Sequence, residues 1–163
     1  MGISLINSVV DFNPIYIENH TVNINADHVS VDVLLHIAQD FKSDPWTIIG
    51  IYFKMSKNEH YRPIFHYDVN VCEILGRSGN NKIGMAHIWL NSFFKFGTLP
   101  KSCPIKKGIY HWNGIRTDHM TIPTILVNGT YKLLITTYFR KERVKRITKE
   151  PVANITILIE VNK

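Results

Sequence analysis

The chain has 163 residues, of which 45% are hydrophobic and 20% charged, the balance of one globular domain over residues 1–163. No run of 18 apolar residues occurs, so we expect no segment that spans a membrane. The formal net charge of +6 permits nucleic acid or an anionic membrane as partners, but spread over the surface it is also ordinary for a soluble protein.

The N-terminal residues do not resemble a signal peptide, because residues 1–6 contain no basic residue and Asn7 and Ser8 interrupt the apolar stretch. Myristoylation would need Ser or Thr at position 6, where Ile6 stands. Three explanations stay open: a signal missing from this sequence, a wrongly placed start, or a cytosolic protein. We expect the first, and therefore a secreted protein.

Period-two alternation predicts the first strands. Residues 28–37 place apolar side chains on one face, and residues 46–56 are apolar on both faces. Residues 61–71 alternate again after a polar turn at 57–60, which predicts a hairpin. The expected inward residues of the first and third strands are Val29, Val31, Val33, Leu35 and Ile37, then Tyr61, Phe65, Tyr67, Val69 and Val71.

Apolar residues at helical spacing mark residues 82–96 as a helix candidate that ends near Gly97 and Pro100. Core packing is the ordinary explanation for such a stripe. Here the segment is apolar almost all round, whereas a helix on one sheet face needs a single apolar stripe. This excess favours the wall or lid of an apolar cavity.

Four more strands are predicted around 109–112, 119–122, 131–139 and 152–161. In the last, Ile155, Ile157, Ile159 and Val161 share one face, which leaves Asn154 on the other. Many short strands with one helical insert predict an all-β fold, an antiparallel β-sandwich.

Catalytic and metal-binding motifs are absent from the sequence. None of the eight histidines forms a His-x-x-x-His pair, and no Gly-x-Ser-x-Gly or phosphate-binding glycine loop occurs. We therefore expect neither an enzyme nor a metal or other cofactor.

The basic run 140–146 lies between two predicted strands, so we expect it to form the tip of a long hairpin. A solvated loop is the favoured interpretation, and contact with an anionic membrane is the alternative; without interleaved aromatic residues, we expect no nucleic acid partner.

The two cysteines, Cys72 and Cys103, are too few by themselves to prove a disulfide framework. Three glycosylation sequons, at Asn19, Asn128 and Asn154, tilt the interpretation towards a secreted glycoprotein. In that compartment two cysteines usually pair.

Residues 103–110, Cys-Pro-Ile-Lys-Lys-Gly-Ile-Tyr, are followed by Ile122-Pro123 and by the run Asn-Gly-Thr-Tyr-Lys at 128–132. This order resembles the second half of ganglioside-activator-type proteins of the ML-type lipid-recognition superfamily. Residues 67–75 resemble the insect branch, a large family of uncharacterised secreted single-domain proteins, in which a strand ends at a cysteine before a helical segment. The resemblance covers residues 28–162.

The resemblance implies an immunoglobulin-like sandwich whose sheets splay around a lipid-sized pocket, and a disulfide between Cys72 and Cys103 that pins the helical insert. It implies extracellular binding of a lipid, fatty acid or pheromone-like hydrocarbon, with a chemosensory role among the candidates. The alternatives are a receptor-binding protein with a collapsed cavity, or a helper that lifts lipid to a hydrolase. From apolarity and position, the expected ligand-binding residues are Phe65, Tyr67, Met85, Ile88, Trp89, Phe93 and Phe96.

Overall fold

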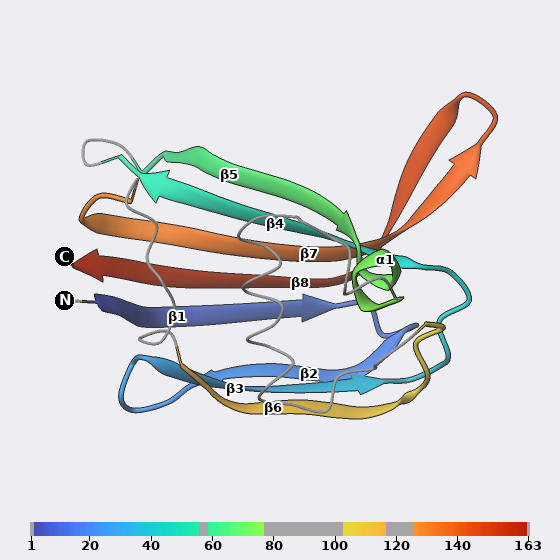
Figure 1. Ribbon diagram of the computed structural model, residues 1–163, viewed down its shortest axis with the longest axis horizontal. Helices are drawn as coiled ribbons and strands as arrows, with labels where there is room; N and C mark the ends of the chain where they lie inside the picture. Colours follow the sequence, from blue (N-terminus) through green and yellow to red (C-terminus); the bar gives the residue numbers. More distant parts are fainter. Residues whose placement is uncertain (1, 56–58, 77–102, 117–125, 163) are drawn as a thin grey trace.

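A computed structural model describes residues 2–55, 59–76, 103–116 and 126–162 (Figure 1). These residues form two stacked antiparallel sheets, with a short helix at the end of the sandwich opposite the chain termini. In chain order the elements are β1 (Gly2–Phe12), β2 (Ile17–Ile24), β3 (Ser30–Ile37), β4 (Pro45–Lys54), β5 (Tyr61–Asn70), α1 (Val71–Gly76), β6 (Gly108–Arg116), β7 (Gly129–Arg143) and β8 (Arg146–Asn162).

The larger sheet has five strands in the order β1-β8-β7-β4-β5, and the smaller has three in the order β2-β3-β6. Every pairing within them is antiparallel. The chain passes from the larger sheet to the smaller one between β1 and β2, and β3 is followed by a return to the larger sheet through β4. The predicted all-β sandwich is confirmed.

Apolar residues at every second position of the strands point inward and form the core between the sheets, as the sequence predicts. Ile157 of β8 and Leu5 of β1 pack against Val22, Val31 and Trp112 of the smaller sheet. Full burial of such apolar side chains contributes about 1.5–3 kcal/mol each. Two further clusters close the ends of the sandwich: one contains Ile17, Ile37, Phe41, Ile105, Phe139 and Val152, and the other contains Ile51, Leu126, Tyr131 and Val161.

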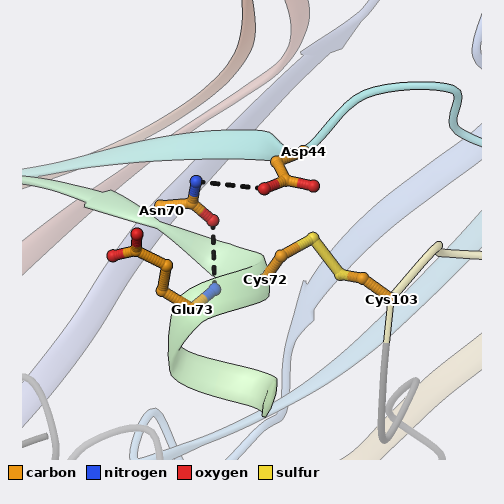
Figure 2. The surroundings of a disulfide bond; sticks show 5 residues. All are labelled: Asp44, Asn70, Cys72, Glu73 and Cys103. Atoms are coloured by element: carbon orange, nitrogen blue, oxygen red, sulfur yellow. Dashed lines mark hydrogen bonds between the residues drawn. A yellow bond between two sulfur atoms is a disulfide. The ribbon is translucent and has the colours of Figure 1, made fainter. Parts of the chain in front are cut away.

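Helix α1 begins directly after β5 because Asn70 caps it. The Asn70 side-chain oxygen accepts a hydrogen bond from the backbone N–H of Glu73 at 3.1 Å, the usual contact of an N-cap residue (Figure 2). The Asn70 amide also donates to Oδ2 of Asp44, in the turn that precedes β4, at 3.3 Å. One side chain therefore fixes both the helix start and the neighbouring turn.

The predicted disulfide between Cys72 and Cys103 is confirmed (Figure 2), with the two Cα atoms 5.6 Å apart. It joins α1 to the segment before β6, and the Cys103–Pro104 peptide bond is cis. The bridge closes a loop between residues 31 positions apart. In the chain-entropy account, a loop of that length stabilises the fold by about 3–4 kcal/mol.

One predicted face was wrong. Tyr61 was expected beside Phe65 on the inward face of β5, but the register shifts between Ile51 and Tyr52, which pair with Phe65 and Pro63. The extra residue in β5 is a β-bulge, and it moves every residue before it to the opposite face. Tyr61 therefore lies on the outer face, where its ring and that of Tyr52 lie beneath the ammonium group of Lys132.

Other differences concern the limits of elements. Strands β1 and β2 were not predicted, and Val71 belongs to α1 rather than to the preceding strand. Val29 lies before β3, and Ser30, the first residue of that strand, is buried. Its hydroxyl is held by the Asp27 carboxylate at 2.9 Å. The predicted helix at 82–96 and strand at 119–122 lie outside the described residues.

Candidate functional site

A continuous apolar row crosses the inner face of the larger sheet. The strand registers place Val10 beside Ile155, Ile155 beside Ile135, Ile135 beside Ile49, and Ile49 beside Tyr67. Paired residues in a sheet project to the same side, so these five side chains line up across β1, β8, β7, β4 and β5. We call these five residues the inner row.

The inner row faces the smaller sheet but is incompletely covered. Val10 and Ile155 pack against the cluster that contains Trp112. Tyr67 nevertheless keeps 36% of its surface exposed, and the other four residues are only partly buried. Inward side chains on the middle strands of a tightly packed sandwich are normally covered by the facing sheet. The row is therefore an accessible apolar surface on the interior side of the sheet.

Phe65 extends this surface beside the inner row. It pairs with Ile51 of β4 and lies two residues before Tyr67, on the same side of β5. The two aromatic rings are nearly parallel, with centroids 6.3 Å apart and an interplanar angle of 14°. Two of the predicted site residues thus lie together on the inner face, while the other five, Met85, Ile88, Trp89, Phe93 and Phe96, lie outside the described residues.

The smaller sheet presents a mixed surface to this interior. Val22, Val33 and Trp112 form one row across β2, β3 and β6, and the next row contains Leu35 and Tyr110. Tyr110 directs its hydroxyl to the backbone oxygen of Lys106 at 2.8 Å. The Tyr110 donor is therefore satisfied at the margin of the sheet. The same row also contains His20, which lies beside Leu35, so the row is mixed in polarity.

Two buried nitrogen-bearing side chains belong to the smaller sheet. Trp112 is 8% exposed and lies in an apolar cluster, and its Nε1 has no hydrogen-bond partner within the described part of the chain. An N–H group left without an acceptor in such surroundings costs about 1–3 kcal/mol. His20 is also buried, and its Nδ1 lies 2.8 Å from the carbonyl oxygen of Leu34. Burial lowers the pKa of His20, while the contact with that carbonyl partly opposes the shift.

Four residues of the inner row were absent from the predicted ligand-binding set. Ile135 and Ile155 belong to strands that the alternation pattern identifies, so their inward orientation was available from the sequence. Ile49 lies in a strand that is apolar on both faces, so the sequence did not show which way it points. Which inward residues lie side by side depends on the strand order, for which the sequence carries no local signal. Val10 belongs to β1, a strand that was not predicted.

A separate polar cleft of about 340 Å³ lies at the base of the β7–β8 hairpin. On its wall, Glu150 accepts a hydrogen bond from the Tyr16 hydroxyl at 2.5 Å and pairs with the Lys141 ammonium group at 2.7 Å. The Lys141 and Tyr16 contacts lower the pKa of Glu150, and the bond to Glu150 raises the pKa of Tyr16. The residues lining this cleft are Tyr16, Gln39, Asp40, Lys42, Ser43, Phe139, Arg140, Lys141 and Glu150.

The outer face of the larger sheet carries a second polar cluster, near the same hairpin. The Tyr138 hydroxyl donates to Asp68 at 2.6 Å, and the Arg140 guanidinium pairs with the same carboxylate at 3.1 Å. The guanidinium also lies over the Trp46 ring, 3.4 Å from its centroid. These contacts join β7 to β4 and β5 where the hairpin leaves the sheet.

Among the described residues, no group of three His, Cys, Asp or Glu side chains could hold a metal ion. No helix in the described ranges is long and apolar enough to cross a membrane.

The three sequons occupy different environments. Asn19 and Asn128 are exposed, whereas Asn154 is partly buried and accepts a hydrogen bond from the Thr136 hydroxyl at 2.8 Å. Asn154 lies on the outer face, beside Thr136, as the alternation predicts. A glycan would be attached through Nδ2 of Asn154, so the Oδ1 atom that accepts from Thr136 could keep this hydrogen bond.

The fold and this interior surface define a disulfide-bonded, all-β two-sheet sandwich with an apolar, partly accessible inner face. Residues 49–133, just over half of the chain, match the family described as "Protein of unknown function (DUF1091)", and the chain belongs to that family. The matched segment begins in β4 and ends in β7, so it includes both cysteines of the disulfide. No curated protein matches the chain.

Proposed function

We propose that this protein binds an apolar ligand between its two sheets. The observation that carries the proposal is the inner row, five apolar residues across one whole sheet, none of which is fully buried. Water contact with such a surface is unfavourable by about 25 cal/mol for each Å². An acyl or other hydrocarbon chain that covers the row would remove this cost.

The ML-type resemblance of residues 103–110 and 128–132 supports the same function, because the sheets of that superfamily splay around lipid. We infer an extracellular location, which the Cys72–Cys103 disulfide supports, since such bonds persist in oxidising compartments. Within that location, a lipid, a fatty acid or a pheromone-like molecule is the expected ligand class, with chemosensation as one role.

Trp112 narrows the ligand class. Trp112 belongs to the apolar cluster against which Leu133 and Ile155 of the facing sheet pack, and its indole N–H is buried. Once the side chains that cover Trp112 move apart, a ligand with an acceptor oxygen, such as a fatty acid or its ester, would satisfy this donor, whereas a pure hydrocarbon would not. We therefore expect an amphiphile with a single polar group rather than a simple alkane.

The direct test is identification of the ligand in protein secreted from eukaryotic cells. Native mass spectrometry is expected to show a bound molecule that is lost on denaturation, and the delipidated protein is expected to take up a fluorescent fatty acid saturably. Protein that carries no lipid and shows no saturable uptake would contradict the proposal. It would favour the receptor-binding alternative, in which the interior is filled by the protein's own side chains.

Neighbouring residues of β7 offer a matched pair of variants. Ile135 lies in the inner row, whereas Leu134 projects to the outer face of the same strand and is similarly half-buried. Ile135→Trp is expected to fill part of the interior and reduce fatty-acid uptake at least tenfold. Leu134→Trp is expected to leave uptake within twofold of the parent protein, and equal losses in both variants would place the ligand elsewhere.

A lipid-presenting helper for a hydrolase would share this binding step. Reconstitution with candidate lipid hydrolases separates the two roles, because a helper raises the hydrolysis rate of membrane-embedded substrate while a carrier does not. A rate increase that Ile135→Trp abolishes would favour the helper.

A further inference from the structure

The hairpin of β7 and β8 extends beyond both sheets as an arm, residues 140–149 (Figure 1). Backbone pairing continues to its tip, where Arg143 lies opposite Arg146. Val144 and Lys145 form the turn, and Lys145 adopts a left-handed conformation with φ of 70°. Because the strands stay paired along its whole length, the arm is an ordered element that presents its turn away from the sandwich.

The base of the arm is firmly attached to the rest of the fold. Tyr138 and Phe139 are only 2% and 5% exposed. Arg140 is held between the Asp68 carboxylate and the Trp46 ring on the outer face. On the other side, Lys141 pairs with Glu150 in the polar cleft. The base of the arm is therefore fixed to both sides of the larger sheet, and the position of the tip relative to the sandwich is fixed with it.

Most of the protein's excess positive charge lies in this arm. It contains six basic residues and one acid, so it accounts for five of the six net positive charges of the chain. Arg140 and Lys141 pair with carboxylates at the base, but no carboxylate in the described residues pairs with Arg143, Lys145 or Arg146 at the tip. These three side chains are exposed and available to an external anion.

The tip also exposes apolar side chains where a solvated turn would have none. Val144 is 94% exposed and Ile147 is 59% exposed. Two-residue hairpin turns favour Gly, Asn or Asp, and a β-branched residue is among the least suited to them. Valine at the outermost position, flanked by three cations, combines the two features that bind proteins to anionic bilayers.

We propose that the arm docks the protein onto an anionic lipid bilayer, with Val144 entering the headgroup region and Arg143, Lys145 and Arg146 contacting lipid phosphates. The arm contains no aromatic residue on which a base could stack, which favours a bilayer over single-stranded nucleic acid. This inference does not depend on a ligand in the sandwich interior, because the arm and the inner row are separate surfaces.

The experiment is flotation of the full, disulfide-bonded chain with vesicles of phosphatidylcholine alone or with added phosphatidylserine. We expect binding only to the anionic vesicles, and weaker binding as salt rises. A basic side chain near such a surface changes partitioning about fivefold. Arg143→Glu combined with Arg146→Glu is therefore expected to reduce binding at least tenfold, and Val144→Ser severalfold.

Matched controls lie at the opposite end of the sandwich. Lys54→Glu with Arg62→Glu makes the same change in net charge at exposed positions, and Val127→Ser removes a valine that is 58% exposed. Both controls are expected to keep most of the vesicle binding. Equal losses in arm and control variants, or equal binding to neutral vesicles, would overturn the inference. So would binding to single-stranded DNA through the arm without any binding to vesicles.

Discussion

The Tyr16 hydroxyl donates a 2.5 Å hydrogen bond to Oε1 of Glu150, across 134 positions of the chain. The Tyr16 ring packs edge-on against Phe139, with centroids 4.9 Å apart, and Lys141 holds the other oxygen of Glu150 at 2.7 Å. The turn between β1 and β2 is thereby tied to the base of the arm. This contact therefore joins the N-terminal part of the chain to the base of the arm.

Loss of this contact is expected to destabilise the fold in a pH-dependent way. Because the folded-state pKa of Glu150 is lowered, its contribution is present above the ordinary glutamate pKa of about 4.3 and is lost as pH falls through the lower folded value. Tyr16→Phe is expected to lower the melting temperature by roughly 2–4 °C at pH 7. Glu150→Gln should flatten the acid side of the stability curve, measured by chemical denaturation from pH 3 to pH 7. An unchanged acid slope would show that Glu150 does not contribute to it.

His20 is expected to make the fold sensitive to mildly acidic conditions. Its pKa is lowered by burial, so between the folded pKa and the ordinary value of 6.5 the unfolded chain binds more protons than the folded protein. Stability is therefore full above pH 6.5 and falls with decreasing pH, by at most about 1.4 kcal/mol per pH unit. His20→Gln should remove this slope between pH 5 and 6.5, whereas His66→Gln, at an exposed position, should leave it. The same slope in both variants would assign it to another group.

Removal of the disulfide is expected to cost about 3–4 kcal/mol, since the bridge closes a loop between residues 31 positions apart. The variant is Cys72→Ser with Cys103→Ser, which avoids a single unpaired thiol. Urea denaturation of this variant and the parent protein gives the difference directly. A loss below about 1 kcal/mol would mean that the segment between the cysteines is held by other contacts.

Strand faces were the most predictable part of this fold. In residues 28–37 and 152–161, strict alternation placed Val33 and Ile157 inward, and both contribute to the packing between the sheets. The physical reason is that successive side chains of a strand point to opposite faces, so a strand with one buried face carries an apolar residue at every second position. The face of Tyr61 was mispredicted because a bulge changes the phase, and only the pairing with β4 reveals the bulge.

The candidate site was predictable only in part, for a related reason. Phe65 and Tyr67 were predicted from their apolarity and position, and they lie together on the inner face. The inner row joins Val10 to Tyr67 through strands far apart in sequence, and that order follows from long-range pairing rather than local pattern. The sequence also could not show that the Trp112 N–H has no hydrogen-bond partner among the described residues, because that depends on which groups lie beside it in the folded structure.

Two glycines with similar backbone angles are expected to differ in their tolerance of a side chain. Gly108 and Gly129 have φ values of 148° and 151°, so alanine is strained at both. A Cβ at residue 129 would also lie 2.6 Å from the Phe53 ring, whereas nothing lies within 4 Å at residue 108. Gly129→Ala should therefore cost about 1–3 kcal/mol more than Gly108→Ala in urea denaturation. Equal costs would mean that the Phe53 ring moves aside freely.

Trp112 is expected to discriminate between ligands by polarity rather than by length. Trp112→Phe removes the indole N–H and leaves some empty volume, and the volume change should affect all ligands of one chain length alike. An acceptor-bearing ligand additionally loses a hydrogen bond in a dry environment, worth about tenfold in affinity.

The measurement is displacement of a fluorescent fatty acid by a long-chain methyl ester and by the alkane of the same length. Trp46→Phe on the outer face is the control, and it should leave both affinities unchanged. A loss of ester affinity about tenfold greater than that of the alkane assigns the donor role to Trp112, and equal changes for the two ligands contradict it. Absence of binding by either compound to the parent protein would instead contradict the interior ligand site itself.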